Sequence, residues 1–239
     1  MLVLKNITIS LKKKIFKMKT AIVTGASKGV GRATVKLLSN NGYKVIAVSR
    51  DLEKMKDLLS DNVEIYSLDI TKQDKIKEFY EKHKDITLDL LVNSAGGGYD
   101  PKSIMYETME NFRIAYDINV SGPMYISQLF VPCMQKSQSP TIIFITSIGG
   151  NVPYPGGGNY TNAKRGQIGL IETMRLEFPE HKIKVTEICP GSIDTQEQKK
   201  ENALTAEDLA NSILWISSLP SYCNVNSLNI SHLGNAVFR

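Results

Sequence analysis

A tyrosine and a lysine four residues apart, Tyr160 and Lys164, form the pair in this sequence best suited to acid–base chemistry. On a helix, residues at this spacing project from one face, so both side chains can address one ligand. A free phenol has a pKa of about 10. A fixed ammonium nearby stabilises the phenolate, so we predict that Lys164 lowers the pKa of Tyr160 and that Tyr160 acts as a general acid and base. The same spacing also occurs on ordinary amphipathic surface helices, so the surrounding sequence must decide between the two interpretations.

A glycine-rich turn near the amino end indicates where a nucleotide binds. A short apolar run at 21–23 predicts a buried strand, the segment TGASKGVG follows at 24–31, and a helical pattern covers 30–40. Glycines in such a turn let the backbone approach a pyrophosphate, whose charge is received by the N–H groups that open the helix. The residues predicted to bind the dinucleotide here are Gly25, Ser27, Lys28, Gly29, Val30 and Gly31.

The end of the second predicted strand, 43–48, indicates which dinucleotide is bound. An acidic residue at this point would bind the ribose hydroxyls of NAD, but the sequence has Ser49 and Arg50. Asp51 comes too late and is expected to cap a helix at 52–59. Arginine suits a 2′-phosphate, and Lys28 supplies a second cation, so we predict NADP(H) as the cofactor. The alternative for Arg50 is an exposed residue at the start of a helix.

The alternation of strands and helices continues along the chain. Further strands are predicted at 63–68, 88–92, 141–146, 184–188 and 227–230, and helices at 72–84, 109–136, 160–177 and 206–217, the last with Thr205 as its N-cap. Small or polar residues follow several strands, at 93–98, at Ser147 and at 189–195. Open α/β sheets bind ligands at these strand ends. The pattern predicts one α/β domain that covers 18–239.

The net charge of +5 comes from residues that precede this domain. Five lysines and no acidic residue lie before Met18, so the remainder of the chain is neutral and nucleic-acid binding is not predicted. No apolar run reaches the roughly 20 residues of a membrane span. Three cysteines without C-x-x-C pairing fit a reducing compartment, which predicts a cytoplasmic protein. Neither the cysteines nor the three histidines show metal-ligand spacing, so no metal site is predicted.

Residues 1–17 contain lysines and short apolar stretches but no secretory signal pattern. The sequence MKTAIVTGAS begins at Met18, directly before the first strand. We therefore expect residues 1–17 to form an extension outside the domain, either disordered or read from an upstream start codon. A basic amphipathic contact with a membrane surface is the alternative.

With these residues assigned, the sequence resembles the short-chain dehydrogenase/reductase family over nearly all of 18–230. The matching motifs stand in family order: T-G-x-x-x-G-x-G at 24–31, Asp69 with Ile70, N-x-A-G at 93–96, Asn119, Ser147, Y-x-x-x-K at 160–164, and Pro190 with Gly191. The resemblance implies a Rossmann-type, doubly wound parallel sheet of seven strands with helices on both faces. A short segment between Thr195 and 206 and the absence of a glycine-rich ending depart from many members. The chain looks more like the NADP-linked subgroup that includes sepiapterin reductase and related carbonyl or hydroxy-acid reductases.

The resemblance also implies the roles of individual residues. Hydride passes between a nicotinamide and a carbonyl or alcohol, Tyr160 exchanges the proton on oxygen, and Ser147 polarises that oxygen. Lys164 holds the nicotinamide ribose, and Asn119 supports a proton relay. Two hydroxyl donors would stabilise the negative charge that hydride addition builds on oxygen. Besides the turn and Arg50, the implied cofactor contacts are Asp69, Ile70, Asn93, Ala95, Gly96, Tyr160, Lys164, Pro190, Gly191, Ile193 and Thr195.

The predicted function is therefore an NADP(H)-dependent oxidoreductase. The alternative is a regulator or sensor that binds NADP with little turnover, and the intact Ser147, Tyr160 and Lys164 argue against it. The substrate pocket is expected between 97–98, 149–154 and the segment that begins at 192. No arginine stands in these segments to clamp an anion, which favours a small uncharged ketone, aldehyde or diketone. Lys199 and Lys200 could instead meet an anion.

The resemblance further implies self-association. The predicted helices 109–136 and 160–177 form the usual dimer surface of the family, and Gly166 and Gly169 would permit close helix approach. Ile168, Leu170 and Ile171 supply apolar area nearby. We expect a homodimer or homotetramer.

Overall fold

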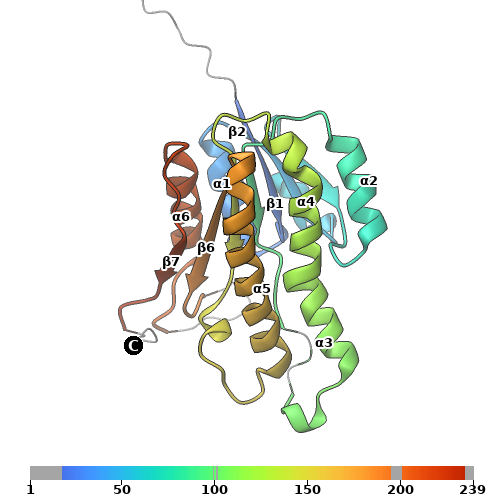
Figure 1. The fold of residues 1–239 in the computed structure, drawn as a ribbon, viewed down its shortest axis with the longest axis vertical. Coiled ribbons are helices and arrows are strands. Elements are labelled where there is room, and N and C mark those ends of the chain that lie inside the picture. The colour runs from blue at the N-terminus through green and yellow to red at the C-terminus, as the bar shows by residue number, and fades with distance from the viewer. Residues whose placement is uncertain (1–17, 99, 101, 195–200, 235–239) are drawn as a thin grey trace, which may run out of the picture.

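Seven parallel strands form a single sheet in the order β3-β2-β1-β4-β5-β6-β7 (Figure 1). The computed structural model describes residues 18–98, 100, 102–194 and 201–234, so the predicted extension 1–17, Thr195 and the pair Lys199 and Lys200 lie outside the described residues. The strands are β1 (Lys19–Thr24), β2 (Tyr43–Ser49), β3 (Val63–Ser67), β4 (Leu90–Asn93), β5 (Thr141–Ile145), β6 (Lys184–Pro190) and β7 (Ser227–Ile230).

Helices alternate with these strands along the chain. The α-helices are α1 (Gly29–Asn40), α2 (Gln73–His83), α3 (Met109–Tyr116), α4 (Gly122–Met134), α5 (Gly158–Glu177) and α6 (Ala206–Ser218). The shorter turns of helix are η1 (Glu53–Leu58), η2 (Ile104–Tyr106), η3 (Asp117–Ser121), η4 (Ile148–Gly150) and η5 (Phe178–His181), of which η3 is a π-helix and the others are 3-10 helices. The predicted doubly wound sheet with helices on both faces is confirmed.

Alternate residues of the central strands enter two separate hydrophobic cores. Val23 and its same-face neighbours pack with α1 and α6, whereas Ile22 and its same-face neighbours pack with α2, α4 and α5. Figure 1 shows α4 and α5 on the near side of the sheet. Because both faces are covered, the central strands read as continuous apolar runs rather than as an alternating pattern, which is why the sequence predicted them well.

The strand order reverses its direction between β1 and β4. From β1 the chain winds outward to β2 and β3, whereas from β4 it winds the other way to β7. The connections that leave β1 and β4 therefore diverge at the carboxyl ends of these two neighbouring strands. Ligands of open α/β sheets bind in the crevice that such a divergence leaves.

Two predicted helices differ from expectation. The segment 52–59 forms only the 3-10 helix η1, with the Asp51 carboxylate accepting a hydrogen bond from the Lys54 backbone N–H at 3.3 Å. A segment this short has little length over which to stabilise an α-helix. The predicted helix 109–136 is interrupted at η3, where the backbone widens into one π turn between α3 and α4. By contrast, Thr205 caps α6 as predicted, in a reciprocal capping box with Asp208.

The proposed role of Gly166 in contacts between copies needs correction. A Cβ atom at Gly166 would lie 3.1 Å from Tyr116 Cε2, so this glycine allows α5 to pack against α3 within the chain. Ile171 is fully buried in the core, whereas a Cβ atom at Gly169 would meet no atom within 4 Å. In the part of the chain that the structure describes, no helix is both long and apolar enough to span a membrane.

Candidate active site

The glycine turn between β1 and α1 is a tight backbone cradle. Gly25 and Gly29 have φ angles of +71° and +53°, which favour glycine. A Cβ atom at Gly25 would lie 2.7 Å from Ala95 N, and one at Gly31 would lie 2.4 Å from Gly25 O. Among the described residues, no side-chain hydrogen bond caps the start of α1, and its first turn contains no acidic residue. The positive end of this helix is therefore suited to receive a phosphate.

A cleft of about 570 Å³ opens beside this turn, at the carboxyl ends of the strands. It brings together most of the predicted cofactor residues: Gly25, Ser27, Lys28, Gly29, Val30, Arg50, Asp69, Ile70, Ala95, Gly96, Tyr160, Lys164 and Ile193 all line it. The predicted catalytic pair is thus continuous with the predicted nucleotide cradle. This continuity is what transfer between a bound nucleotide and a substrate beside Tyr160 requires.

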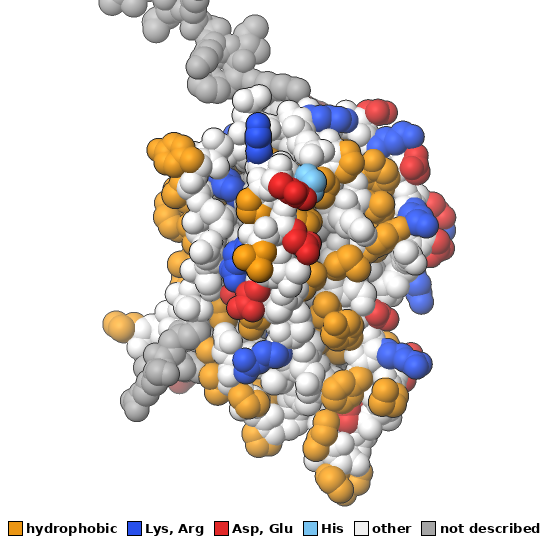
Figure 2. Space-filling model, viewed as in Figure 1, with side chains coloured by type: hydrophobic (Ala, Val, Ile, Leu, Met, Phe, Trp, Pro, Cys, Tyr) orange, Lys and Arg blue, Asp and Glu red, His pale blue; other side chains and the backbone are white. Residues whose placement is uncertain are grey.

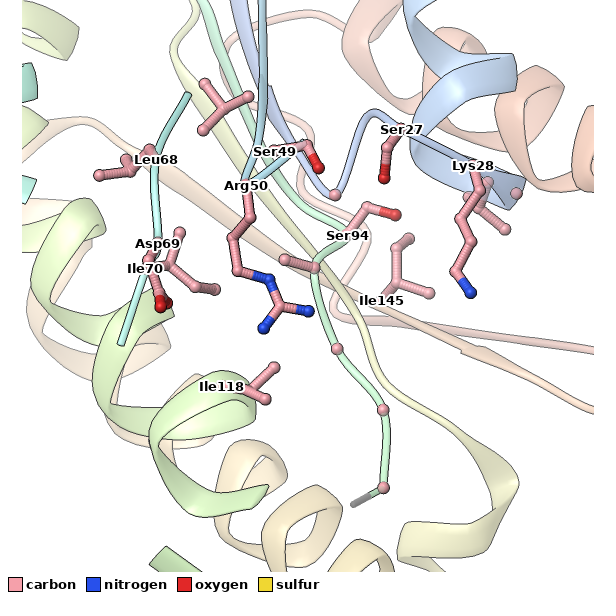
Figure 3. A pocket seen from close by; sticks show the side chains of 18 of the residues that line it. Ser27, Lys28, Ser49, Arg50, Leu68, Asp69, Ile70, Ser94, Ile118 and Ile145 are labelled. Atoms are coloured by element: carbon pink, nitrogen blue, oxygen red, sulfur yellow. The ribbon is translucent and has the colours of Figure 1, made fainter. Parts of the chain in front are cut away.

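Arg50 follows β2 and extends into the cleft, on the side lined by Asp69, Ile70 and Ile118 (Figure 3). No side chain of the described residues forms an ion pair or hydrogen bond with its guanidinium. Asp69 is engaged elsewhere, since its Oδ1 accepts hydrogen bonds from the Thr71 backbone N–H at 3.0 Å and hydroxyl at 2.8 Å. The Arg50 guanidinium is therefore available to an anion.

Ser147 and Tyr160 lie close together, Ser147 after the end of β5 and Tyr160 in the first turn of α5. Ser147 Oγ accepts a hydrogen bond from the Gly149 backbone N–H at 3.1 Å, which fixes the turn η4. A Cβ atom at Gly149 would lie 3.1 Å from Tyr160 Cε1 and 3.4 Å from Ser147 Oγ, so glycine leaves room beside both hydroxyl-bearing side chains. Burial raises the pKa of Tyr160 above its ordinary value of 10.0, and hydrogen bonding with Ser147 opposes that rise.

Lys164 is buried behind Tyr160, with 3% of its surface exposed. Its Nζ donates to the Ile145 carbonyl oxygen at 2.8 Å and to Gln167 Oε1 at 2.9 Å, and it lies 5.9 Å from the centroid of the Tyr160 ring. Burial lowers the pKa of Lys164 from 10.5 to about 7, while Cys189 and Glu187 act in the opposite direction. The prediction that Lys164 lowers the pKa of Tyr160 is wrong for this structure, because burial of the phenol raises its pKa and Lys164 contributes no lowering of it.

Asn119 lies in the π turn η3 and is fully buried. Its Nδ2 donates to Ala115 O at 2.7 Å and to Gly97 O at 2.8 Å, and its Oδ1 accepts from the Gly97 N–H at 3.2 Å. A Cβ atom at Gly96 would lie 2.9 Å from Asn119 Oδ1 and 3.0 Å from Lys164 Nζ. Asn119 therefore holds the backbone that separates it from Lys164.

Several predicted residues lie outside the lining of this cleft. Those that the structure describes are Gly31, Asn93, Asn119, Ser147, Pro190 and Gly191. Asn93 instead donates to Ser127 Oγ at 3.2 Å in the interior, and the Gly191 N–H donates to Ile230 O at 2.8 Å, which joins β6 to β7. Asn93 and Gly191 therefore support the strand ends from behind.

The cleft also contains residues that the sequence did not predict as cofactor contacts. They are Val48, Ser49, Leu68, Ser94, Gly97, Gly98, Ile114, Ile118, Ile145 and Thr146. Most of them lie at the end of a strand or directly after it, a position that could have marked them. Ile114 and Ile118 come from α3 and η3, and their spacing of four residues was the available signal.

Comparison with known proteins identifies the family. A family model described as short chain dehydrogenase matches residues 19–205. The chain belongs to the short-chain dehydrogenase family. It is 30% identical over 227 residues to an uncharacterized oxidoreductase of Staphylococcus epidermidis, an alignment that covers 90% of this chain and 97% of the relative. It is 31% identical over 223 residues to the 3-oxoacyl-[acyl-carrier-protein] reductase FabG of Thermotoga maritima, which covers 84% of this chain and 90% of that relative.

Solved structures of the family agree with this fold. The chain superposes on serine dehydrogenase from Escherichia coli with a TM-score of 0.82 and 29% identity, covering 91% of this chain and 99% of that one. A closed form of serine dehydrogenase complexed with NADP+ gives a TM-score of 0.81 at 27% identity, covering 91% of this chain and 96% of that chain. The predicted cofactor, NADP(H), is the one named for that structure and for a metagenomic short-chain oxidoreductase with a TM-score of 0.79, 25% identity and coverage of 90% and 98%.

Proposed function

We propose that this short-chain dehydrogenase is an NADP(H)-dependent reductase that interconverts a small carbonyl compound and its alcohol. The observation that carries the proposal is the continuity of one cleft from Arg50 to Tyr160 and Lys164. The cradle at Gly25 and Gly31, which side chains would fill, supports a bound pyrophosphate at the start of α1.

Different residues of the cleft would bind different parts of the cofactor. The turn 25–31 would hold the pyrophosphate, Arg50 and Lys28 the 2′-phosphate, and Asp69 with Ile70 the adenine side. Lys164 would meet the nicotinamide ribose. A charge-assisted contact between Arg50 and the 2′-phosphate contributes about 1.5 to 3 kcal/mol, which favours NADPH over NADH by about ten- to a hundredfold.

When bound, NADPH supplies the hydride that reduces the carbonyl carbon. The protein supplies the proton and the hydrogen bonds. The phenol of Tyr160 is protonated at neutral pH, since burial raises its pKa further above the ordinary value of 10.0, and it serves as the proton donor to the carbonyl oxygen. Ser147 donates a second hydrogen bond to that oxygen, which stabilises the developing charge. Asn119 keeps the 96–98 backbone in place beside Lys164, so we assign it a supporting role in the relay of protons.

We further propose that the substrate is a small, mostly uncharged ketone, aldehyde or diketone. Gly98 and Gly149 both lie against Tyr160, which leaves space there, and the exposed Val152 and Tyr154 offer apolar and aromatic surface. One arginine from outside the predicted pocket segments, Arg165 of α5, also reaches this region. Its guanidinium donates a hydrogen bond to the Asn151 carbonyl oxygen at 3.3 Å, so the backbone engages it there. The names of the relatives do not indicate one substrate class, because a serine dehydrogenase and a 3-oxoacyl-[acyl-carrier-protein] reductase are both among them.

The activity is tested with a panel of carbonyl compounds, by monitoring the loss of NADPH absorbance. The variant Tyr160→Phe tests the mechanism. Removal of the proton donor should lower turnover by about 10²- to 10⁴-fold, while NADPH binding stays close to that of the unmodified protein. Turnover near the original rate in Tyr160→Phe would reject the mechanism. NADPH binding without turnover on any substrate would instead favour the regulatory alternative.

A second comparison tests the substrate class. Catalytic efficiency on a neutral diketone should exceed that on acetoacetyl thioesters, 3-oxo acids and serine, with the cofactor saturating. A clear advantage for a charged or thioester substrate would overturn the pocket argument and leave the reductase proposal intact.

We also propose that the chain self-associates through the α3–α4 and α5 face. Figure 2 shows apolar side chains gathered at the lower end of the molecule, over η2 and α3, where Met105, Tyr106 and Met109 are at least 74% exposed. Burial of such a patch against a second copy would remove apolar area from water. Light scattering at micromolar concentration should show a dimer or tetramer, and a monomer alone would reject this proposal.

A further inference from the structure

Gln167 is a buried amide on the same face of α5 as Lys164. The helix places the two residues three positions apart, and Gln167 has no exposed surface. Its Oε1 accepts a hydrogen bond from Lys164 Nζ at 2.9 Å. A fully buried amide requires a reason, because removal of its polar group from water costs free energy unless hydrogen bonds compensate.

The hydrogen bonds of Lys164 leave one N–H for the cleft. An ammonium group has three N–H donors, and two of them are used by Ile145 O at 2.8 Å and by Gln167 Oε1. Lys164 also lines the cleft. The two acceptors therefore fix the rotation of the ammonium so that its third N–H is directed at the cofactor side.

Gln167 is also the side chain that accepts directly from this cation. The titratable groups that face Lys164 are Cys189 and Glu187 from β6 and Tyr160 from its own helix. Glu187 Oε1 instead accepts a hydrogen bond from Thr146 Oγ1 at 2.7 Å. Among the described residues, no carboxylate lies within ion-pair distance of Lys164 Nζ. If the Gln167 side chain were removed, the Ile145 carbonyl oxygen would remain as an acceptor for Lys164 Nζ, and the second acceptor would be lost.

We propose that Gln167 is a positioning residue, which keeps Lys164 charged and aimed at the cofactor ribose. This inference rests on the proposed function, since it assigns Lys164 to the nicotinamide ribose. Gln167 touches neither cofactor nor substrate in this arrangement, and it acts through Lys164 alone.

Two substitutions separate this role from simple packing. Gln167→Leu removes the acceptor and keeps a buried side chain of similar bulk. Gln167→Glu keeps an oxygen near Nζ, adds a negative charge and replaces Nε2, an atom with no hydrogen-bond partner among the described residues. Because the ammonium is the charged form, loss of the acceptor disfavours it and a nearby carboxylate favours it.

The direct readout is the titration of Lys164, which NMR can monitor in protein whose lysines are labelled at Cε. The Lys164 signal is assigned as the one that is absent from the spectrum of Lys164→Arg. Starting from a pKa of about 7, Gln167→Leu should move the titration down by about one pH unit and Gln167→Glu should move it up by about one unit. At pH 8 the Leu variant should bind NADPH about tenfold more weakly, because each unit changes the protonated fraction tenfold. Glu172→Gln, an exposed change on the same helix, should alter neither measurement.

Opposite shifts in the two Gln167 variants would support the proposal. Unchanged titrations in variants whose melting temperatures stay near that of the original protein would overturn it. If Gln167→Leu fails to fold, the comparison of Gln167→Glu with the original protein decides alone. Tyr160→Phe keeps the two proposals apart: retained turnover in that variant rejects the proposed function, whereas an inactive Tyr160→Phe beside unshifted Gln167 variants rejects only the role of Gln167.

Discussion

Two buried lysines stand at opposite ends of the central sheet. Lys164 lies at the carboxyl end with 3% of its surface exposed, and Lys184 begins β6 at the amino end with 7% exposed. Each donates to a backbone carbonyl, Lys164 to Ile145 O at 2.8 Å and Lys184 to Leu219 O at 3.1 Å. Burial is the main cause that lowers the pKa of both ammonium groups.

Their surroundings differ. Lys164 has Gln167 as an acceptor and opens on the cleft, and Glu187 and Cys189 favour its charge. Lys184 is repelled by Lys19 and ties the start of β6 to the connection between α6 and β7. A buried lysine with a depressed pKa is therefore not enough to identify a site. Lys184 also lines a hollow, so the side-chain acceptor and the neighbouring charges, rather than the space in front of the lysine, distinguish the two environments.

The largest expected difference is in turnover. Lys164→Met should lower catalytic efficiency by about 10²- to 10⁴-fold and weaken NADPH binding, because it removes the proposed contact with the nicotinamide ribose. Lys184→Met should leave the dissociation constant of NADPH unchanged within about twofold, since it lies at the other end of the sheet. Steady-state kinetics and calorimetry check both variants. Equal losses in the two would contradict the division between the ends of the sheet.

The pH dependence of stability is the next effect. The pKa of Lys164 is about 7 in the folded chain and returns to its ordinary value of 10.5 on unfolding. Between these values the unfolded chain binds more protons, so the lysine makes the free energy of unfolding increase as the pH rises, by at most about 1.4 kcal/mol per unit. In Lys164→Met this increase should disappear. Urea unfolding at pH 7 and pH 9 measures it, and the same slope in the variant would show that Lys164 is not responsible.

A smaller effect concerns cofactor choice at the two ends of β2. Arg50→Ala should remove the proposed ten- to hundredfold preference for NADPH over NADH, because it deletes the proposed contact to the 2′-phosphate. Lys44→Ala removes an exposed cation from the amino end of the same strand and should keep the preference. Dissociation constants for both cofactors test this pair. Equal constants in the unmodified protein would reject the role of Arg50.

The smallest effect is expected from residues 1–17. They contain no predicted site residue and precede β1, so a protein that begins at Met18 should keep its melting temperature and turnover. A large fall in melting temperature would show that the extension contributes to the fold. Loss of liposome co-sedimentation on truncation would favour the membrane-surface alternative.

The part of the cleft lined by the glycine turn and Arg50 could be predicted from sequence because local chemistry determines it. The turn with Gly25 and Gly29 needs positive φ angles, and Arg50 comes directly after an apolar strand. Gln167 could not be predicted in this way. On a helix of twenty residues, an amide three positions after a lysine is equally compatible with solvent, and only the packing of α5 on the sheet buries it.

The pKa values of the site residues also could not be predicted from the sequence. Spacing showed that Lys164 could stand near Tyr160, but the pKa of each depends on how much water the fold removes from it. The π turn at Asp117–Ser121 has the same kind of cause, since its geometry accompanies the long-range hydrogen bonds of Asn119 to Gly97.

That π turn also bears on how the length of the chain can vary. On one side of it, Tyr116 packs against Gly166 of α5, and on the other, Ile126 and Phe130 fill the core beneath α4. Because a π turn takes about one residue more than an α-helical turn to complete the same rotation, a deletion of one residue within it would restore a regular α-helix and leave both contacts nearly in phase. A deletion of one residue in the regular part of α3 or α4 would instead rotate one half against the other by about 100°, and either the α5 contact or the core contact would be lost. The π turn is therefore the place in this helix where a single codon can be removed with both contacts kept.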